Sequence, residues 1–256
     1  MSEYSAIAAR FARDTAQHEM TVLHDDGLYR HLRFSSRPKG YGEYWFDLIT
    51  WPGCLTVRGD YGDAYTFTRE RDMLPFFRAR SGDINPHYWA QKLDGHRRSA
   101  RTYSEGAFRK VVCELFVDAV RYGDAPRGLG KAVRAEILDM EAFTEEDAHK
   151  LLESFEYGVK YKVSCSCGKM TTEDSETLAQ LWRSSHMEPG RSAHVSRVEC
   201  VPGFTFGDTW ELNFQDYESD FLRACHAIVW GIARYDRVSG YGLQQLAAPA
   251  PKAVAA

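Results

Sequence analysis

Two cysteines and two histidines in the second half of the chain have the types and spacing best suited to a chemical task. Cys165 and Cys167 lie in a Cys-Ser-Cys-Gly turn, and His186 and His194 follow further along. Thiolate and imidazole are the ligands that Zn²⁺ prefers, and four protein ligands in tetrahedral geometry close a structural site. The pattern therefore predicts a structural zinc site formed by Cys165, Cys167, His186 and His194, with Cys200 as an alternative to His194.

The elements that must position these ligands form a module over residues 157–200. Residues 159–164 and 194–200 are typical of strands, and a helix is expected to begin near Asp174 or Ser175 and to end at His186. A module of this size buries little apolar surface by itself. We therefore expect it to depend on a metal or on the main body of the protein.

A second set of residues could hold a hard divalent cation or act as acid and base. The set is His31, Asp47, Asp60 and Asp63. A structural role is the alternative, because Asp47 lies among bulky apolar residues and needs a partner such as Arg33 or Arg58. Aspartates are also common in turns, where they accept hydrogen bonds from the backbone. An enzymatic interpretation of this set would be a metal-dependent hydrolase or nuclease using His31, Asp47 and Asp60.

Four apolar runs at 28–34, 44–50, 54–58 and 64–68 predict an antiparallel meander, because aromatic and β-branched residues alternate there between turn residues. Period-two alternation assigns one set of side chains to the core: Leu32, Phe34, Tyr44, Phe46, Leu48, Leu55, Val57, Tyr65 and Phe67. The opposite, polar face would present His31, Arg33, Trp45, Asp47, Thr56, Arg58, Thr66 and Thr68. This face is either solvated or a docking surface, and His31, Arg33, Trp45, Asp47 and Arg58 are its candidate binding residues.

Helical patterns surround the meander. We expect helices over 3–20, 104–122, 127–140, 144–155 and 216–236, and the last is apolar on most sides, as a buried helix is. The predicted fold class is α+β: an antiparallel β-meander packed against several helices, with an inserted small zinc-binding-like module. The expected domains are 1–156 with 201–242 as the main body, 157–200 as the inserted module and 243–256 as a disordered tail.

The overall composition is that of an ordinary globular protein, with 44% hydrophobic residues and a net charge of −4. The charge argues against a strongly basic nucleic-acid binder, although Arg33, Arg58, Arg97, Arg98 and Arg101 could form a local basic strip. We find no secretory signal or membrane span in the sequence and expect a cytoplasmic protein with reduced cysteines. Cys54, Cys113 and Cys225 lie in apolar runs and are expected to be buried.

Three stretches of the sequence resemble a family of uncharacterised proteins of tailed phages and prophages. They are residues 46–67, from Phe-Asp-Leu-Ile-Thr-Trp-Pro-Gly-Cys to Tyr-Thr-Phe, residues 84–92 (Ile-Asn-Pro-His-Tyr-Trp-Ala-Gln-Lys), and residues 221–236, which end Trp-Gly-Ile-Ala-Arg-Tyr-Asp. The resemblance implies a phage accessory protein acting in the host cytoplasm, in host takeover, counter-defence or genome handling. It implies no catalytic residues.

The chain lacks a glycine-rich nucleotide loop, a Gly-x-Ser-x-Gly elbow and a His-Glu-x-x-His helix. We therefore expect a protein that binds another macromolecule rather than an enzyme. The expected partner is a host or phage protein, with nucleic acid as the second choice.

Overall fold

The structure, a computed structural model, describes residues 3–36, 42–60, 62, 64–78, 83–95, 100–123, 125–186 and 195–240. The chain divides into two compact units: Met1–Thr102 with Tyr217–Ala256, and Tyr103–Asp216. We call them unit 1 and unit 2 and describe each by itself.

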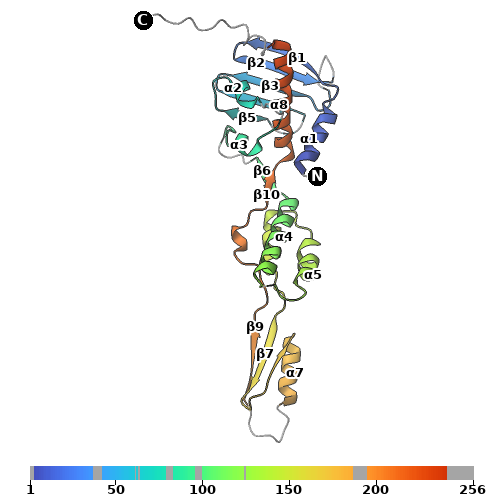
Figure 1. The fold of residues 1–256 in the computed structure, drawn as a ribbon, viewed down its shortest axis with the longest axis vertical. Coiled ribbons are helices and arrows are strands. Elements are labelled where there is room, and N and C mark those ends of the chain that lie inside the picture. Colours follow the sequence, from blue (N-terminus) through green and yellow to red (C-terminus); the bar gives the residue numbers. More distant parts are fainter. Residues whose placement is uncertain are drawn as a thin grey trace, which may run out of the picture. The chain divides into compact units, whose positions relative to one another are not determined.

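Unit 1 contains a five-stranded antiparallel meander with the strands in chain order (Figure 1). Its strands are β1 (Glu19–Asp26), β2 (Tyr29–Ser35), β3 (Phe46–Trp51), β4 (Cys54–Gly59) and β5 (Tyr65–Thr68). The register places Leu32 opposite Leu48 and Leu48 opposite Val57, so that apolar side chains form rows on one face. The α+β fold with its antiparallel meander is thus as the sequence predicts.

Helix α8 (Ser219–Ser239) covers the apolar face of this sheet (Figure 1). Its residues Phe221 and Ile228 are fully buried, and the indole of Trp230 meets the ring of Phe34 edge-on with centroids 5.6 Å apart. Gly231 allows the close approach, because a Cβ atom there would lie only 2.7 Å from Leu48 Cδ1. The last helix is therefore the central core helix of unit 1.

Three further helices of unit 1 flank the sheet. They are α1 (Glu3–Asp14), α2 (Met73–Phe77) and α3 (Pro86–Ala90). Asn85 caps α3 through its side chain, with Pro86 at the first helical position, as the sequence indicates.

The edge strand β1 is an element of the meander that the sequence did not reveal. Helix α1 ends at Asp14, and residues 19–26 pair with β2 instead of extending the helix. The side chains of β1 are mostly exposed, including Val22 at 44% and Leu23 at 48%, so the strand lacks the alternation that a half-buried strand shows. Tyr44, expected in the core row, instead precedes β3 with a left-handed φ of 58°.

Unit 2 has a helical part with its own apolar core. Its helices are α4 (Glu105–Tyr122), α5 (Leu129–Val133), the π-helix η1 (Arg134–Leu138), α6 (Glu145–Ser154) and the 3₁₀ turn η2 (Thr209–Glu211). Phe108, Val112, Ile137 and Leu152 are buried together with Phe214. Thr144 and Asp147 form a reciprocal capping box at the start of α6.

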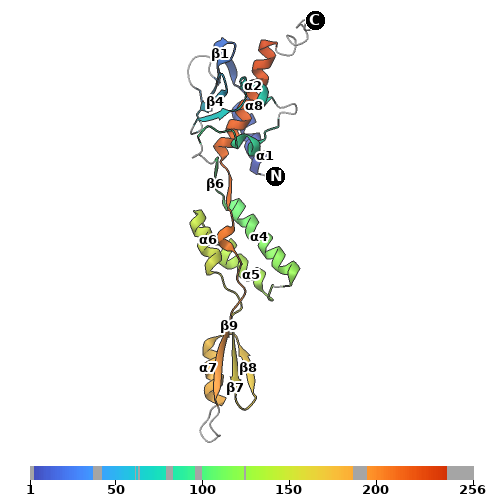
Figure 2. The same cartoon turned by 90° about the vertical axis from the view of Figure 1, so that its left-hand side faces the viewer.

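The remaining part of unit 2 is a small sheet with one helix, which we call the knuckle module (residues 157–201). Its sheet has the order β8-β7-β9 (Figure 2). The strands are β7 (Lys160–Cys165), β8 (Met170–Glu173) and β9 (Ser196–Val201), and α7 (Glu176–His186) packs on the sheet. The expected strand–turn–helix–strand order is present, with β8 added.

The observed units differ from the expected domains. Unit 2 begins at Tyr103 rather than near residue 157, because α4, α5 and α6 bury their apolar stripes in one shared core. The boundaries fall at β6 (Arg101–Tyr103) and β10 (Gln215–Tyr217), which form a two-stranded sheet. Residues 243–256, expected as a tail, lie outside the described part of the chain.

Among the helices that the structure describes, none combines the length and the apolar character that crossing a membrane requires.

Candidate metal centre

A tight turn at the end of β7 places both cysteines of the knuckle module. The backbone N–H of Gly168 donates to the carbonyl of Cys165 at 2.9 Å, and the N–H of Cys165 donates to the carbonyl of Lys169 at 2.9 Å. Gly168 has a φ of 87°, a left-handed conformation that glycine adopts without strain. This turn brings the two sulfur atoms to 3.3 Å from each other.

The third ligand comes from the last residue of α7. Nε2 of His186 lies 3.1 Å from Sγ of Cys167, and the imidazole stacks on the indole of Trp182 with centroids 4.6 Å apart. The ligand atoms of Cys165, Cys167 and His186 all lie within 4.8 Å of one another. Three of the four residues predicted from the sequence therefore meet at one point.

Sequence reasoning missed the role of Trp182. The indole and the imidazole are four residues apart on one helix, and side chains at that spacing are neighbours on the helix surface. The stacking holds the ring of His186 near the turn. The four-residue spacing of Trp182 and His186 in the sequence could have indicated this contact.

The two cysteines differ in their environments. Cys165 is buried and Cys167 is exposed. A backbone hydrogen bond from Lys169 lowers the pKa of the Cys167 thiol, and a hydrogen bond with Cys165 acts in the same direction. A lowered pKa favours the thiolate, which is the form that binds a metal.

The fourth predicted ligand, His194, lies outside the described residues. Its neighbour Val195 is joined to Ser166, the residue between the two cysteines, by hydrogen bonds in both directions. The N–H of Ser166 donates to the carbonyl of Val195 at 2.9 Å, and the N–H of Val195 donates to the hydroxyl of Ser166 at 3.1 Å.

Cys200, the alternative fourth ligand, is placed elsewhere by the sheet register. Cys165 lies opposite Ser196 on β9, whereas Cys200 lies opposite Tyr161. An offset of four residues along a strand corresponds to roughly 13 Å. Cys200 therefore cannot share a metal ion with the knuckle cysteines in this register.

The donor set of the knuckle fits a soft or borderline metal ion. Two thiolates and an imidazole suit Zn²⁺, whereas Mg²⁺ and Ca²⁺ require oxygen ligands. The cluster can thus hold a metal ion.

The second predicted set forms an ion cluster on the polar face of the meander. Arg33 donates two hydrogen bonds to the carboxylate of Asp47, at 2.8 and 2.9 Å, and His31 Nε2 lies 3.0 Å from the same carboxylate. Arg58 approaches it at 3.6 Å. The guanidinium groups of Arg33 and Arg58 also lie over the ring of Trp45, at 5.2 and 5.5 Å from its centroid. All five candidate binding residues are thus in one cluster.

Asp47 is completely buried beneath these side chains. Burial alone would raise the pKa of its carboxyl group, but the hydrogen bonds from Arg33 and His31 outweigh burial and lower the pKa. A carboxylate whose oxygens are occupied by cations serves neither as a metal ligand nor as a base. Asp47 organises the arginines and does not itself present a surface to a partner.

Asp60 belongs to a different local structure. Its carboxylate accepts a hydrogen bond from the backbone N–H of Tyr44 at 2.9 Å, which is the turn role considered for it. Asp63, Arg97 and Arg98 lie outside the described residues. Where the structure describes the chain, only the knuckle cluster brings three or more potential metal ligands together, and His31, Asp47 and Asp60 do not.

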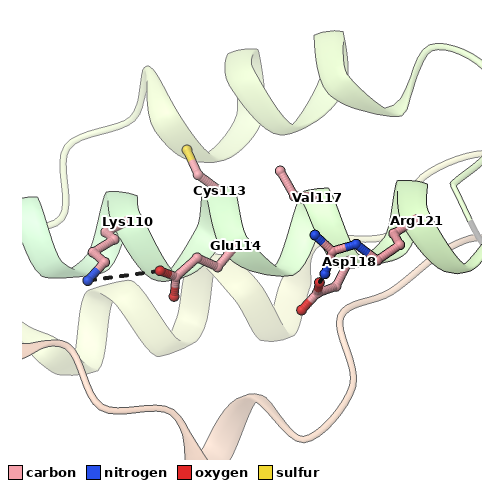
Figure 3. Close-up of a pocket in the computed structure, with 6 residues that line it drawn as sticks. All are labelled: Lys110, Cys113, Glu114, Val117, Asp118 and Arg121. Carbon is pink, nitrogen blue, oxygen red and sulfur yellow. Dashed lines mark hydrogen bonds and ion pairs between the residues drawn. The ribbon is translucent and has the colours of Figure 1, made fainter.

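Helix α4 carries a surface pocket of 430 Å³ that the sequence did not indicate (Figure 3). Its charged side chains pair with each other: Lys110 lies 3.9 Å from Glu114, and Arg121 lies 3.1 Å from Asp118. Cys113, expected to be buried, is exposed in this pocket, whereas Cys225 on α8 is buried as predicted and Cys54 is half-buried.

Comparisons with protein-family models, with curated proteins and with solved structures give no match for this chain.

Proposed function

We propose that the knuckle module binds one Zn²⁺ ion through Cys165, Cys167 and His186, and that this ion fixes the end of α7 to the turn between β7 and β8. The observation that carries the proposal is the convergence of three soft ligand atoms within 4.8 Å of one another. Thiolate and imidazole side chains gathered in this way are the usual ligands of structural zinc.

His194 is the proposed fourth ligand. The paired hydrogen bonds between Ser166 and Val195 support this assignment, because they hold the residue adjacent to His194 at the turn that carries both cysteines. Four protein ligands would close the coordination sphere and leave no position for a catalytic water.

The scarcity of apolar core supports a structural role for the metal. In the described part of the knuckle module, the buried apolar side chains are Val163, Cys165 and Ala179. So small a core stabilises a fold only weakly, and small domains commonly add a metal or disulfides.

The proposed activity of the protein is the binding of another macromolecule, with a protein partner favoured. Leu178 and Leu181 are 47% and 65% exposed and lie three residues apart on α7, and Met170 on β8 is 66% exposed. Exposed apolar side chains on a metal-fixed scaffold suit a protein surface better than a phosphate backbone. The phage origin inferred from the resemblance stays a prediction.

The metal content of the purified full-length protein tests the proposal. We expect one zinc ion per chain by inductively coupled plasma mass spectrometry, and loss of most of it in Cys165→Ser. The matched control is Cys200→Ser, which removes a thiol of the same module that the register places away from the cluster, and it should keep the zinc. Protein that contains no zinc after reconstitution under reducing conditions would contradict the proposal.

A metal bound equally well by Cys165→Ser and the parent would place the site elsewhere. His194→Ala tests the fourth ligand separately. We expect weaker binding, about 10-fold or more, because a site that loses one ligand loses affinity even where the others remain.

A further inference from the structure

The two knuckle cysteines have a second property beyond their donor chemistry: their sulfur atoms are already in contact. They lie 3.3 Å apart, whereas a disulfide bond is about 2.05 Å long. The turn closed by the hydrogen bond from Gly168 to Cys165 holds the two residues at this separation. Forming the bond requires the two side chains to change rotamer and close a remaining gap of roughly 1.3 Å.

The exposure of the two sulfurs differs in a way that assigns their roles. Cys167 is exposed and can meet a reagent from solvent, whereas Cys165 is buried directly behind it. An accessible thiol with a second thiol next to it is the arrangement in which oxidation proceeds to a disulfide rather than to higher oxides.

We infer that a hydroperoxide oxidises Cys167 and Cys165 to a reversible disulfide, and that this reaction expels the metal and frees the end of α7. The disulfide step rests on the sulfur geometry, while the expulsion step rests on the proposed metal site.

The chemistry balances with the hydroperoxide as the only oxidant. The Cys167 thiolate attacks one peroxide oxygen, the O–O bond breaks, and an alkoxide or hydroxide leaves, giving a sulfenic acid. The Cys165 thiolate then attacks that sulfur, the S–O bond breaks and hydroxide leaves. Two thiolates are oxidised by two electrons and one peroxide is reduced. The metal departs because a disulfide sulfur is no longer a thiolate ligand, and His186 with the proposed ligand His194 is too small a ligand set to hold it.

The consequence for the module follows from the position of His186. This residue is the last of α7, and its contact with Cys167 ties the helix end to the turn at the end of β7. Oxidation would replace a bond between the helix and the sheet by a bond within the turn. We therefore expect α7 to leave the sheet and the module to loosen as it does when the metal is removed.

The experiment uses full-length protein loaded with zinc and treated with hydrogen peroxide. Zinc release is followed with a chromogenic chelator, and the peptide containing both cysteines is analysed by mass spectrometry. We expect release of the bound zinc in step with a mass loss of two hydrogens on that peptide, and recovery of both after dithiothreitol and fresh zinc. Cys113→Ser and Cys200→Ser, which remove the exposed thiols outside the cluster, should behave like the parent protein.

Two results would overturn the inference. In one, Cys167 gains two oxygen atoms without forming a disulfide; in the other, the disulfide forms and the zinc stays bound. Treating metal-free protein in parallel separates this inference from the proposed function. Protein that never binds zinc but forms the disulfide refutes the metal site and the expulsion step. Protein that binds zinc but forms no disulfide refutes only the inference.

Discussion

The ion cluster around Asp47 and the ligand cluster around Cys165 are both small polar groups on antiparallel sheets, yet they are completed differently. The buried carboxylate of Asp47 already meets the cations of Arg33 and Arg58 within the protein. Cys165, Cys167 and His186 instead bring three electron-pair donors together. The first cluster is complete in itself, whereas the second could hold a cation from outside the chain.

The two clusters also differ in the size of the apolar core beneath them. Phe46 and Leu48, on either side of Asp47, are fully buried against the core that α8 completes. In the described part of the knuckle module, the buried apolar side chains are only Val163, Cys165 and Ala179. Unit 1 should therefore hold its structure by packing, and the knuckle module by the proposed metal.

Removing the metal should have the largest effect and tests this comparison most directly. With a strong zinc chelator under reducing conditions, we expect residues 160–186 and 195–201 to lose hydrogen-exchange protection while β2, β3 and β4 keep theirs. Binding of structural zinc contributes about 10–16 kcal/mol in small zinc peptides, far more than so small a core provides. Equal loss of protection in both units, measured by mass spectrometry, would remove the distinction.

Phe34→Ala should give the next largest effect, and in unit 1 alone. Phe34 is fully buried and stacks on Phe46 with centroids 4.7 Å apart. Truncating a buried Phe costs about 3–5 kcal/mol of unfolding free energy through lost burial and the cavity that remains. Hydrogen exchange measured at increasing urea concentration should show this loss of stability as a lower urea midpoint for the β2 and β3 peptides.

The control for that substitution is Tyr29→Ala on the same strand. Tyr29 is 54% exposed, so we expect a change within about 0.5 kcal/mol. Similar losses in both variants would mean that packing on α8 is not what stabilises unit 1.

Asp47→Asn should destabilise unit 1 to a smaller extent. Breaking a buried ion pair costs about 3–5 kcal/mol, and we expect a value at or below the lower end because Arg58 is 47% exposed. Asp60→Asn is the matched control, since it affects one exposed turn hydrogen bond that contributes about 1 kcal/mol. Urea unfolding at neutral pH compares the two, and a larger loss in Asp60→Asn would contradict the assigned roles.

The smallest expected effect is the pH dependence of the stability difference between the parent protein and Asp47→Asn. Because the folded-state pKa of Asp47 is lowered, the unfolded chain binds its proton at a higher pH than the folded protein does. The stability due to ionised Asp47 is therefore present above about pH 4, the ordinary value for aspartate, and disappears as the pH falls through the folded-state pKa. The gap in stability between parent and Asp47→Asn should shrink on acidification. A gap that widens instead would reverse the sign of the shift.

The meander and its covering helix were predictable because each has a strong local pattern. Alternation placed Leu32, Phe34, Leu48 and Val57 in the core, and apolar residues on most sides of the helix over 221–235 identified it as buried. The need of Asp47 for an arginine partner was also visible, since a carboxylate between Phe46 and Leu48 cannot remain unpaired.

Other features depend on the tertiary structure. The edge strand β1 lacks alternation because most of its side chains face solvent. The exposure of Cys113 depends on which side of α4 meets its neighbours, and an apolar run does not specify that side. Ligand spacing predicted the cluster of Cys165, Cys167 and His186, but only the pairing of β7 with β9 separates Cys200 from it.

The order of the segments in unit 1 has a consequence for biosynthesis. The last of the five meander strands ends at Thr68, whereas the helix that covers them begins at Ser219, so the ribosome must add about 150 more residues before the two can meet. At about 5–20 residues per second, synthesis of these residues takes roughly 8–30 s, during which the apolar face of the sheet is not yet covered by α8. Unit 2 is contiguous in the chain and can mature first. The nascent meander is thus the stage at which a chaperone would be most useful.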